Sequence, residues 1–424
     1  MTRRAGDGGF ARRNALVALS FLASFVAYSD RVNISVAAVA MKERLGWTQT
    51  DKGLVLSSFF VGYMAFMFAS GWLATRYGGK RVLGAAVLAW SACTLLTPPA
   101  AALSLAALIA VRIAMGVGEA AMFPAALELY GRWVPLSERA RAVARLMSGI
   151  PLGTVVGLMA SGWLVSAYGW PMPFYVFGAL GLVWAALWFP LVGNDPRTDR
   201  RVSAAERALL ARECPPAAAV EAVPWRTLLL HGRVWATVAA HFATTWTLYV
   251  LLSWLPSYFR EVQGLSLANA GLYSAGPWLA NALVANLAAT VSDAMVRRGV
   301  SVTFTRKLIQ CTGLLGSAAL LLVARDVHSP AVAFLVLCAA TGALGCTWCG
   351  YAPSLLDLAP RHSALLFGFS NTLATIPGIV GVAVTGWLVD VTGTYSSTFV
   401  LTACISVAGA AVFAAFFSAR PIIE

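Results

Sequence analysis

Long apolar blocks recur along the whole chain and are separated by short polar segments. Each block is about 20 residues long, the length at which an α-helix crosses the hydrocarbon core of a bilayer. The pattern predicts twelve membrane-spanning helices, near residues 14–40, 51–75, 82–99, 103–128, 143–167, 172–192, 231–258, 268–291, 307–324, 330–355, 362–389 and 396–418. We therefore expect an all-α, multi-pass membrane protein.

One long polar segment, residues 193–229, divides the first six blocks from the last six. It is rich in Arg, Glu, Ala and Pro and predicts a cytoplasmic linker, with an amphipathic helix near 204–212 at the membrane surface. The sequence SerGlyTrpLeuVal at 161–165 returns as ThrGlyTrpLeuVal at 385–389. We therefore expect two six-helix bundles, 1–192 and 230–424, related as parallel repeats.

Charge and composition support a chain that lies within a lipid bilayer. With 59% hydrophobic and only 12% charged residues, the chain has too little polar surface for a soluble protein. Most of the 31 Lys and Arg residues lie in the amino terminus, the even-numbered loops and the carboxyl terminus, which predicts that both termini are cytoplasmic. Contact of these basic loops with anionic lipid headgroups accounts for the net charge of +13, so we expect no nucleic-acid partner.

Residues with catalytic or metal-binding chemistry are sparse and scattered. The seven cysteines lie mostly within apolar blocks, and the pair Cys346 and Cys349 is typical of small packing residues in a membrane helix. The four histidines lie near helix ends or in loops, and His241 is interpreted as a packing residue, with titration near neutral pH as the alternative. No nucleotide loop or metal-ligand cluster is present. We therefore expect no enzyme activity, no metal and no cofactor.

Four charged side chains interrupt the apolar blocks: Asp30 and Arg31 in the first, and Arg112 and Glu119 in the fourth. Ionisable groups are costly in hydrocarbon and usually mark the pathway of an ion or a substrate. Arg112 and Glu119 are seven residues apart, which places them on one helix face about 10 Å apart. Both acids are expected near the bilayer midplane, where the sites of transporters lie.

Two glycines, Gly116 and Gly118, lie between Arg112 and Glu119 and leave little side-chain volume there. Water or a neighbouring helix can therefore approach this face. Burial favours the neutral form of a carboxyl group and a nearby arginine favours the carboxylate, so Glu119 and Asp30 are candidate proton carriers, with Arg112 tuning Glu119. The alternative is a permanent buried ion pair that only positions helices.

A motif between the second and third spans indicates a family. The sequence GWLATRYGGKR at 71–81 resembles the G-x-L-A-D-R-x-G-x-K-R loop of the major facilitator proteins, with Thr75 in place of the usual Asp. Residues 292–299 occupy the matching place in the second half. We expect both loops to contribute to gating, through Arg76, Lys80 and Arg81 in the first and Asp293 and Arg297 in the second. A solvated basic loop is the alternative, and the missing Asp implies a weakened or rewired latch.

Three further motifs narrow the resemblance. Residues 111–124, VRIAMGVGEAAMFP, resemble the R-x-x-x-G-x-x-E-A-x-x-x-P signature of the anion:cation symporters. Residues 28–37, YSDRVNISVA, and 241–252, HFATTWTLYVLL, resemble matching motifs of the same family, which includes sialin, the vesicular glutamate transporters and bacterial sugar-acid carriers such as the galactonate permease. The resemblance covers almost the whole chain and implies the twelve-helix major facilitator fold.

The resemblance implies proton-coupled import of a small organic monoanion, such as a sugar acid, by alternating access. Protons are the coupling ion, and a functional monomer in a bacterial inner membrane is expected. Arg31 is the expected ligand of the carboxylate because its planar fork of donors matches that group. The resemblance adds as further substrate-binding residues Tyr28, Tyr63, Thr347, Trp348 and Asn371.

Departures from the family pattern leave the substrate open. Thr244 stands where the vesicular glutamate carriers have an arginine, which favours a monoanion over a dicarboxylate. Thr245 stands where sialin-like sequences have Asn, and residues 148–154 lack the amide expected of a galactonate carrier. An uncoupled or exchange carrier of an organic or inorganic anion, including phosphate, remains an alternative. A drug exporter of the same fold is disfavoured, because it would not need a substrate-facing arginine.

Overall fold

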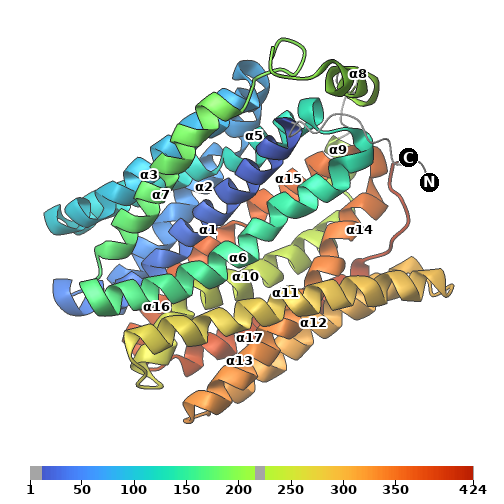
Figure 1. Cartoon of the computed structure of the whole chain (residues 1–424). Helices are drawn as coiled ribbons and strands as arrows, with labels where there is room; N and C mark the ends of the chain where they lie inside the picture. Colours follow the sequence, from blue (N-terminus) through green and yellow to red (C-terminus); the bar gives the residue numbers. More distant parts are fainter. Residues whose placement is uncertain (1–11, 215–224, 424) are drawn as a thin grey trace.

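The computed structural model describes residues 12–214 and 225–423, and within these residues the regular structure is helical. Among these described residues, twelve helical spans are long and apolar enough to cross a membrane, as the sequence pattern predicts. The spans form two bundles that lie side by side (Figure 1). The spans of the first bundle are α1 (Arg12–Leu45), α2 (Gln49–Tyr77), α3 (Gly79–Leu103), α4 (Leu105–Glu119) with α5 (Met122–Trp133), α6 (Leu136–Tyr168) and α7 (Met172–Leu191).

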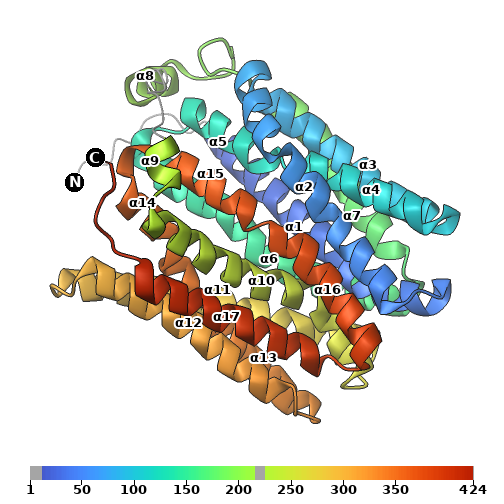
Figure 2. The ribbon, with the colours of Figure 1, turned by 180° about the vertical axis from the view of Figure 1, so that it is seen from behind.

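The second bundle repeats this arrangement. Its spans are α10 (Gly232–Glu261), α11 (Leu267–Arg297), α12 (Val302–Ala324), α13 (Pro330–Gly345) with η1 (Cys346–Cys349) and α14 (Tyr351–Leu358), η2 (Pro360–His362) with α15 (Ser363–Leu373) and α16 (Ile376–Thr392), and α17 (Ser396–Phe416). The bundles meet where α6 packs against α11, at the front of Figure 1, and where α2 packs against α16, at the front of the view from behind (Figure 2). The two described ends of the chain lie at one end of the molecule, here called the terminal end.

The segment between the bundles contains α8 (Ala204–Glu213) and α9 (Trp225–Leu229). Polar contacts attach α8 to the first bundle. Glu206 accepts hydrogen bonds from the main-chain N–H of Arg13, at 3.3 Å, and from its guanidinium, at 3.1 Å. Glu213 accepts one from the hydroxyl of Ser137 at 2.7 Å. These contacts tie the helix to the terminal ends of α1 and α6.

Glycines bring α1 and α6 into close contact, as expected of helices that pack in lipid. A Cβ atom at Gly149 would lie 2.7 Å from the carbonyl oxygen of Phe21, and one at Gly153 would lie 2.3 Å from that of Phe25. The hydroxyl of Ser29 donates to the Gly153 carbonyl at 3.0 Å. The close approach of these two helices fixes the orientation of α1, which carries Asp30 and Arg31.

The fourth span is interrupted immediately after Glu119 because of Pro124. A proline in a helix has no N–H to donate and its ring excludes the carbonyl four residues earlier, here that of Ala120. That carbonyl instead lies 3.1 Å from the hydroxyl of Ser70 in α2, whose single proton is shared with the carbonyl of Met67 at 2.7 Å. A side chain of a neighbouring helix thus satisfies the freed main-chain group, as the bilayer interior requires.

The tenth span has the same kind of interruption, at η1. Pro353 excludes a helical bond to the carbonyl of Cys349, which accepts instead from the guanidinium of Arg306 at 3.5 Å. The N–H of Tyr351, at the start of α14, donates to Oε1 of Gln310 in α12 at 3.0 Å. Interrupted helices in corresponding positions of two repeats are the best sequence-level indication of a transporter's binding site.

Candidate functional site

Arg31 and Glu119 form a buried ion pair between the first and fourth spans. Oε2 of Glu119 accepts from both Nη2 and Nε of Arg31, at 2.7 and 3.2 Å. The Arg31 side chain is 7% exposed and that of Glu119 is fully buried. Among the described residues, Oε1 of Glu119 has no hydrogen-bond partner. Only one of the two carboxylate oxygens is therefore used by the arginine.

Aromatic rings surround the guanidinium of Arg31. Its Cζ atom lies 4.5 Å from the ring centre of Tyr28, 4.7 Å from that of Phe59 and 5.1 Å from that of Tyr63. Ring faces attract a cation, and they do so more strongly where water is excluded. The sequence resemblance named both tyrosines, and the structure brings them to Arg31. Phe59 was not predicted, because nothing in its sequence context distinguishes it from other packing residues of the second span.

Arg112 lies close to this pair without a carboxylate partner in the described part of the chain. Its Nη1 contacts the sulfur of Met115 at 3.1 Å, and its Cζ lies 5.4 Å from the ring centre of Phe59. The side chain is buried, and its Nε has no partner among residues 12–214 and 225–423. Arg31, rather than Arg112, holds Glu119 in this conformation. Helix spacing placed Arg112 and Glu119 on one face but could not identify the partner across helices.

Asp30 is the least satisfied acid of the site. It is fully buried, and within the described ranges neither carboxylate oxygen has a hydrogen-bond partner. The side chains of Trp90 and Thr94 in α3 are its polar neighbours, and the indole N–H of Trp90 also finds no acceptor among the described residues. An ionised carboxylate without partners is costly in such surroundings. The site thus contains one acid that is paired with an arginine and a second that is not.

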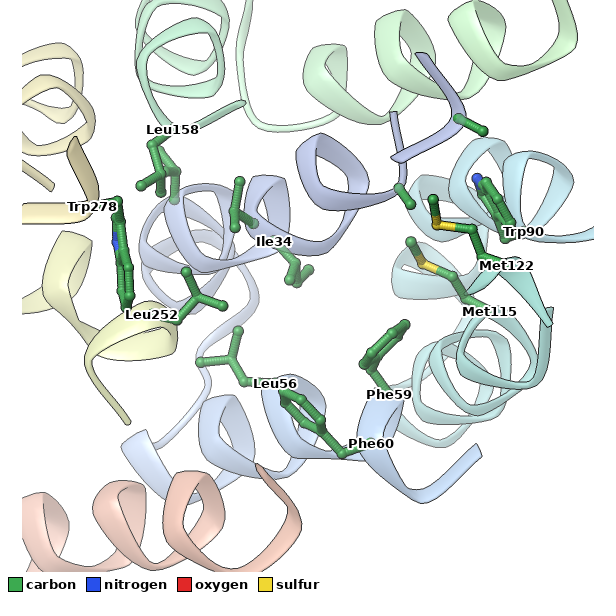
Figure 3. Packing of buried hydrophobic residues seen from close by; sticks show 14 of the residues in the cluster. Ile34, Leu56, Phe59, Phe60, Trp90, Met115, Met122, Leu158, Leu252 and Trp278 are labelled. Carbon is green, nitrogen blue, oxygen red and sulfur yellow. The ribbon is translucent and has the colours of Figure 1, made fainter. Parts of the chain in front are cut away.

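A small cavity adjoins both arginines. It is lined by Arg31, Ile34, Ser35, Leu56, Phe59, Phe60, Arg112, Leu252 and Ser253. Its volume of about 10 Å³ holds about one water molecule, so the site is closed around the charges in this conformation. Figure 3 shows Leu252 of α10 next to Leu56 of α2, with Ile34 of α1 and Phe59 of α2 on the sides. Both bundles therefore contribute to the walls.

The second bundle adds polar aromatic groups. The ring of Tyr249 packs against that of Phe60, with 4.5 Å between ring centres. Tyr351 is fully buried, and its hydroxyl is unpaired among the residues that the structure describes. The ring of His241 stacks on Tyr351 at 4.0 Å, and its Nδ1 lies 2.9 Å from the hydroxyl of Ser370. This position agrees with the interpretation of His241 as a packed and satisfied residue.

The predicted substrate residues of the second bundle are dispersed. Thr347 is fully buried, and its hydroxyl donates within its own helix to the carbonyl of Leu344 at 2.6 Å. Trp348 is 40% exposed and packs at an angle against Tyr351. The amide nitrogen of Asn371 approaches the sulfur of Met67 across the bundle interface at 3.5 Å. None of the three contacts Arg31 in this conformation through a hydrogen bond of the described chain.

The predicted gating residues lie exposed or half-buried near the terminal end. Within the described chain none of the five forms an ion pair; they are Arg76, Lys80, Arg81, Asp293 and Arg297. The acid that meets the start of the third span is Glu128 of α5, whose Oε2 accepts from the N–H of Gly79 at 2.7 Å. A carboxylate at the positive end of a helix is favourable. Glu128 thus provides a carboxylate at this loop, whose motif has Thr75 in place of the usual Asp.

Ion pairs between the bundles occur at the end opposite the termini. Glu261 of α10 pairs with Lys52 of α2 at 3.0 Å and with Lys42 of α1 at 3.6 Å. Asp390 of α16 accepts from the N–H groups of Gln49 and Thr50, at 3.0 and 2.7 Å, and so caps the start of α2 from the other bundle. None of these residues was predicted from the sequence. The signal was present, because Lys52 lies inside the second apolar block.

Comparison with known proteins supports the family inferred from the sequence. Residues 20–378 match the profile of the Major Facilitator Superfamily. A protein of Arabidopsis thaliana named sodium-dependent phosphate transport protein 1, chloroplastic, is 38% identical over 98% of this chain and 81% of its own length. The ascorbate transporter, chloroplastic, of the same plant is 35% identical over 98% of this chain and 76% of its own.

Solved structures agree with the fold. A bacterial homologue of the human lysosomal transporter Spinster, inward-facing and occupied, has a TM-score of 0.80 at 18% identity, over 96% of this chain and 97% of that one. A D-xylose-proton symporter has a TM-score of 0.74 at 15% identity, over 96% and 98%. The profile match, the similar sequences and the twelve-span structure lead to one conclusion. The chain belongs to the Major Facilitator Superfamily.

Proposed function

We propose that this protein imports a small organic monoanion, a sugar acid or a related carboxylate, together with protons by alternating access. The observation that carries the proposal is the buried pair of Arg31 and Glu119 beside a cavity between the bundles. Arginine is permanently charged and suits a carboxylate or a phosphate, whereas its partner Glu119 can take up a proton. The relatives named for phosphate and ascorbate are consistent with an anionic substrate.

The geometry supports a simple exchange of partners. A substrate anion and Oε2 of Glu119 would occupy the same side of the Arg31 guanidinium, so they compete for it. Protonation of Glu119 removes its negative charge and releases Arg31 for the substrate. Oε1 of Glu119 and the carboxyl of Asp30, which have no hydrogen-bond partner in the described chain, give incoming protons two acceptors within the first bundle. Binding of the anion is thereby linked to protonation without any change in the charge of Arg31.

The residues around Arg31 suit a hydroxylated substrate. Tyr28 and Tyr63 provide hydroxyl groups as well as ring faces, and Tyr249 of the second bundle lies behind Phe60. Movement of the second bundle toward the first would bring Trp348 and Asn371 to the same space. An indole face binds a carbon skeleton and an amide binds hydroxyls. We also propose that the exposed basic loops at Arg76 and Arg297 take part in closing the terminal end.

Sodium is a second candidate for the coupling ion, because the similar phosphate transport protein is named sodium-dependent. The two oxygens of Asp30 have no partner in the described chain, and a carboxylate could accept either a proton or a small cation. Purified protein in liposomes, loaded with separate proton and sodium gradients and given labelled ascorbate or phosphate, tells the two apart. Proton coupling predicts accumulation under the proton gradient with sodium absent.

The role of Glu119 is tested in the same liposomes with Glu119→Gln. The variant is expected to lose accumulation driven by a proton gradient but to retain exchange of labelled for unlabelled substrate, because Gln carries no proton across the cycle. Glu43→Gln, at an exposed position of the same bundle, is the matched control and should behave as the unmodified protein. Accumulation by Glu119→Gln at the unmodified rate would remove Glu119 from the coupling step.

A further inference from the structure

Glu261 forms ion pairs with two lysines of the opposite bundle. Its Oε1 lies 3.0 Å from Nζ of Lys52 and 3.6 Å from Nζ of Lys42. The Lys52 side chain is 0% exposed, although it lies close to the end of its helix, and its ammonium lies 4.7 Å from the ring centre of Trp254. Oε2 of Glu261 accepts from the hydroxyl of Tyr395 at 2.8 Å. A single carboxylate therefore faces two cations, the buried Lys52 and the partly exposed Lys42.

The two lysines are aligned with the substrate site. Lys42 follows Arg31 by eleven residues on α1, and Tyr63 follows Lys52 by eleven residues on α2. Eleven residues amount to about three helical turns, which returns to within about 20° of the same face some 16 Å along the axis. Lys42 thus lies above Arg31 and Lys52 above Tyr63, at the end opposite the termini, which the positive-inside rule assigns to the outer side.

Hydroxyl groups line the path between the two levels. The ammonium of Lys52 donates to the hydroxyl of Ser257 in α10 at 3.0 Å. Ser253 lies one turn further inward on α10 and lines the cavity beside Arg31, together with Ser35 of α1. The polar path therefore runs from the paired lysines to the substrate arginine along the surfaces on which the two bundles meet.

We propose that Lys42 and Lys52 form an outer binding site for the carboxylate or phosphate group of the transported anion. Glu261 occupies this site when the outer end is closed. When the bundles separate at that end, Glu261 leaves with the second bundle, and the two lysines receive an incoming anion before it reaches Arg31. This inference rests on the proposed function, because it concerns the same substrate.

A latch without an anion site is the simpler alternative. Both descriptions predict that removal of Glu261 opens the outer end. Only the anion site predicts that an added anion then covers the lysines. Protection of the lysines by an added anion therefore distinguishes the anion site from a latch.

The chain itself provides a specific probe, because it contains only four lysines, namely Lys42, Lys52, Lys80 and Lys307. The first two lie at the outer end, and the other two lie near the terminal end, where α3 and α12 begin. A membrane-impermeant amine-acylating reagent added outside sealed right-side-out vesicles therefore reaches only Lys42 and Lys52. Modification is read for each lysine by peptide mass spectrometry. Modification at Lys80 or Lys307 reports leaky or inverted vesicles.

In unmodified protein we expect slow acylation of Lys52. Glu261→Gln should raise it by about tenfold, because the Lys52 ammonium loses its ion-pair partner and the outer end opens more often. Inorganic phosphate or ascorbate should then suppress acylation at concentrations where choline chloride of equal ionic strength does not. Asp326→Asn is the matched control, because it removes one negative charge from an exposed loop at the same end, where Asp326 pairs with Arg325 and with no other cation of residues 12–214 and 225–423. Its acylation pattern should equal that of unmodified protein.

Either of two results would overturn the outer site. The first is acylation of Lys52 that rises in Glu261→Gln but is unaffected by both anions, which leaves only a latch. The second is acylation that does not rise at all. If Glu261→Gln does not fold, Tyr395→Phe removes one hydrogen bond to Glu261 and keeps the charge, so a smaller rise with the same protection by anions is expected. Protection without any uptake would refute the proposed function alone, whereas uptake without protection would refute only this site.

Discussion

Helices α2 and α4 approach each other so closely that an added methyl group at their contact should lower stability by a predictable amount. A Cβ atom at Gly116 would lie 2.0 Å from the carbonyl oxygen of Phe59 and 2.8 Å from the N atom of Tyr63. A Cβ atom at Gly62 would lie 1.9 Å from the carbonyl oxygen of Ile113. All three contacts are to main-chain atoms, which cannot rotate away. Gly116→Ala therefore requires α2 and α4 to move apart.

The required movement is large on the scale of helix packing. The closest contact of a Cβ atom at Gly116 would be about 1.4 Å shorter than an ordinary van der Waals contact. Overpacking of this kind costs about 1–3 kcal/mol. The movement also displaces Phe59, whose ring lies next to both Arg31 and Arg112. We expect Gly116→Ala to lower the midpoint of thermal unfolding and to weaken anion binding by about tenfold, or about 1.4 kcal/mol.

Both effects can be measured on purified protein. Thermal unfolding in detergent gives the stability, and the rise of the midpoint with increasing ascorbate or phosphate gives the affinity. Gly71→Ala in α2 and Gly131→Ala in α5 are matched controls, because a Cβ atom at either position meets nothing within 4 Å. Alanine favours a helix over glycine by about 1 kcal/mol, so the controls should be neutral or slightly stabilised. If Gly116→Ala behaves as the controls do, the α2–α4 contact does not position the site.

Three further predictions concern individual side chains of the first bundle. Arg31→Ala should abolish the stabilisation of purified protein by anions, whereas Arg31→Lys keeps the charge without the planar fork and should retain only part of it in the same titration. Stabilisation of Arg31→Ala equal to that of unmodified protein would remove Arg31 from the site. Asp30→Asn should leave the unfolding midpoint nearly unchanged, because the described chain offers neither oxygen of Asp30 a hydrogen bond, and should alter the pH dependence of uptake. An unchanged pH profile would exclude Asp30 from coupling. Glu128→Ala should cost about 1 kcal/mol of stability through loss of the acceptor for Gly79, and a midpoint equal to that of Glu43→Ala would contradict this.

Much of the fold follows from hydrophobicity alone. Each apolar block must satisfy its main chain internally, so twelve blocks of sufficient length give twelve helices. The interruptions were not predicted, although Pro124 and Pro353 are visible in the sequence. Whether a proline bends or breaks a membrane helix depends on which neighbour satisfies the freed carbonyl, here Ser70 and Arg306. That information lies in the packing of distant segments.

The site could be predicted only in part, because it too depends on how distant segments of the chain pack. Charges within apolar blocks predict that Arg31, Arg112 and Glu119 belong to a polar pathway, and spacing along a helix predicts which residues share a face. Which arginine holds Glu119 depends on how α1 and α4 pack, so the pairing with Arg31 needed the structure. Lys52 was overlooked because a lysine at the start of a span is ordinarily a residue of the membrane interface. Only the structure shows its side chain buried against Trp254 and Glu261.

The proline interruptions of the fourth and tenth spans have a mechanical consequence. At each one a main-chain hydrogen bond of the helix is replaced by a bond to a side chain of another helix, so bending there disturbs few helical bonds. The short segments α5 and α14 can then tilt as separate levers, while α4 and α13 keep their contacts at the outer end. The terminal end can therefore open or shut while Glu261 still holds the outer end closed. In the alternating-access cycle proposed above, two such hinges would produce an occluded intermediate that is sealed at both ends.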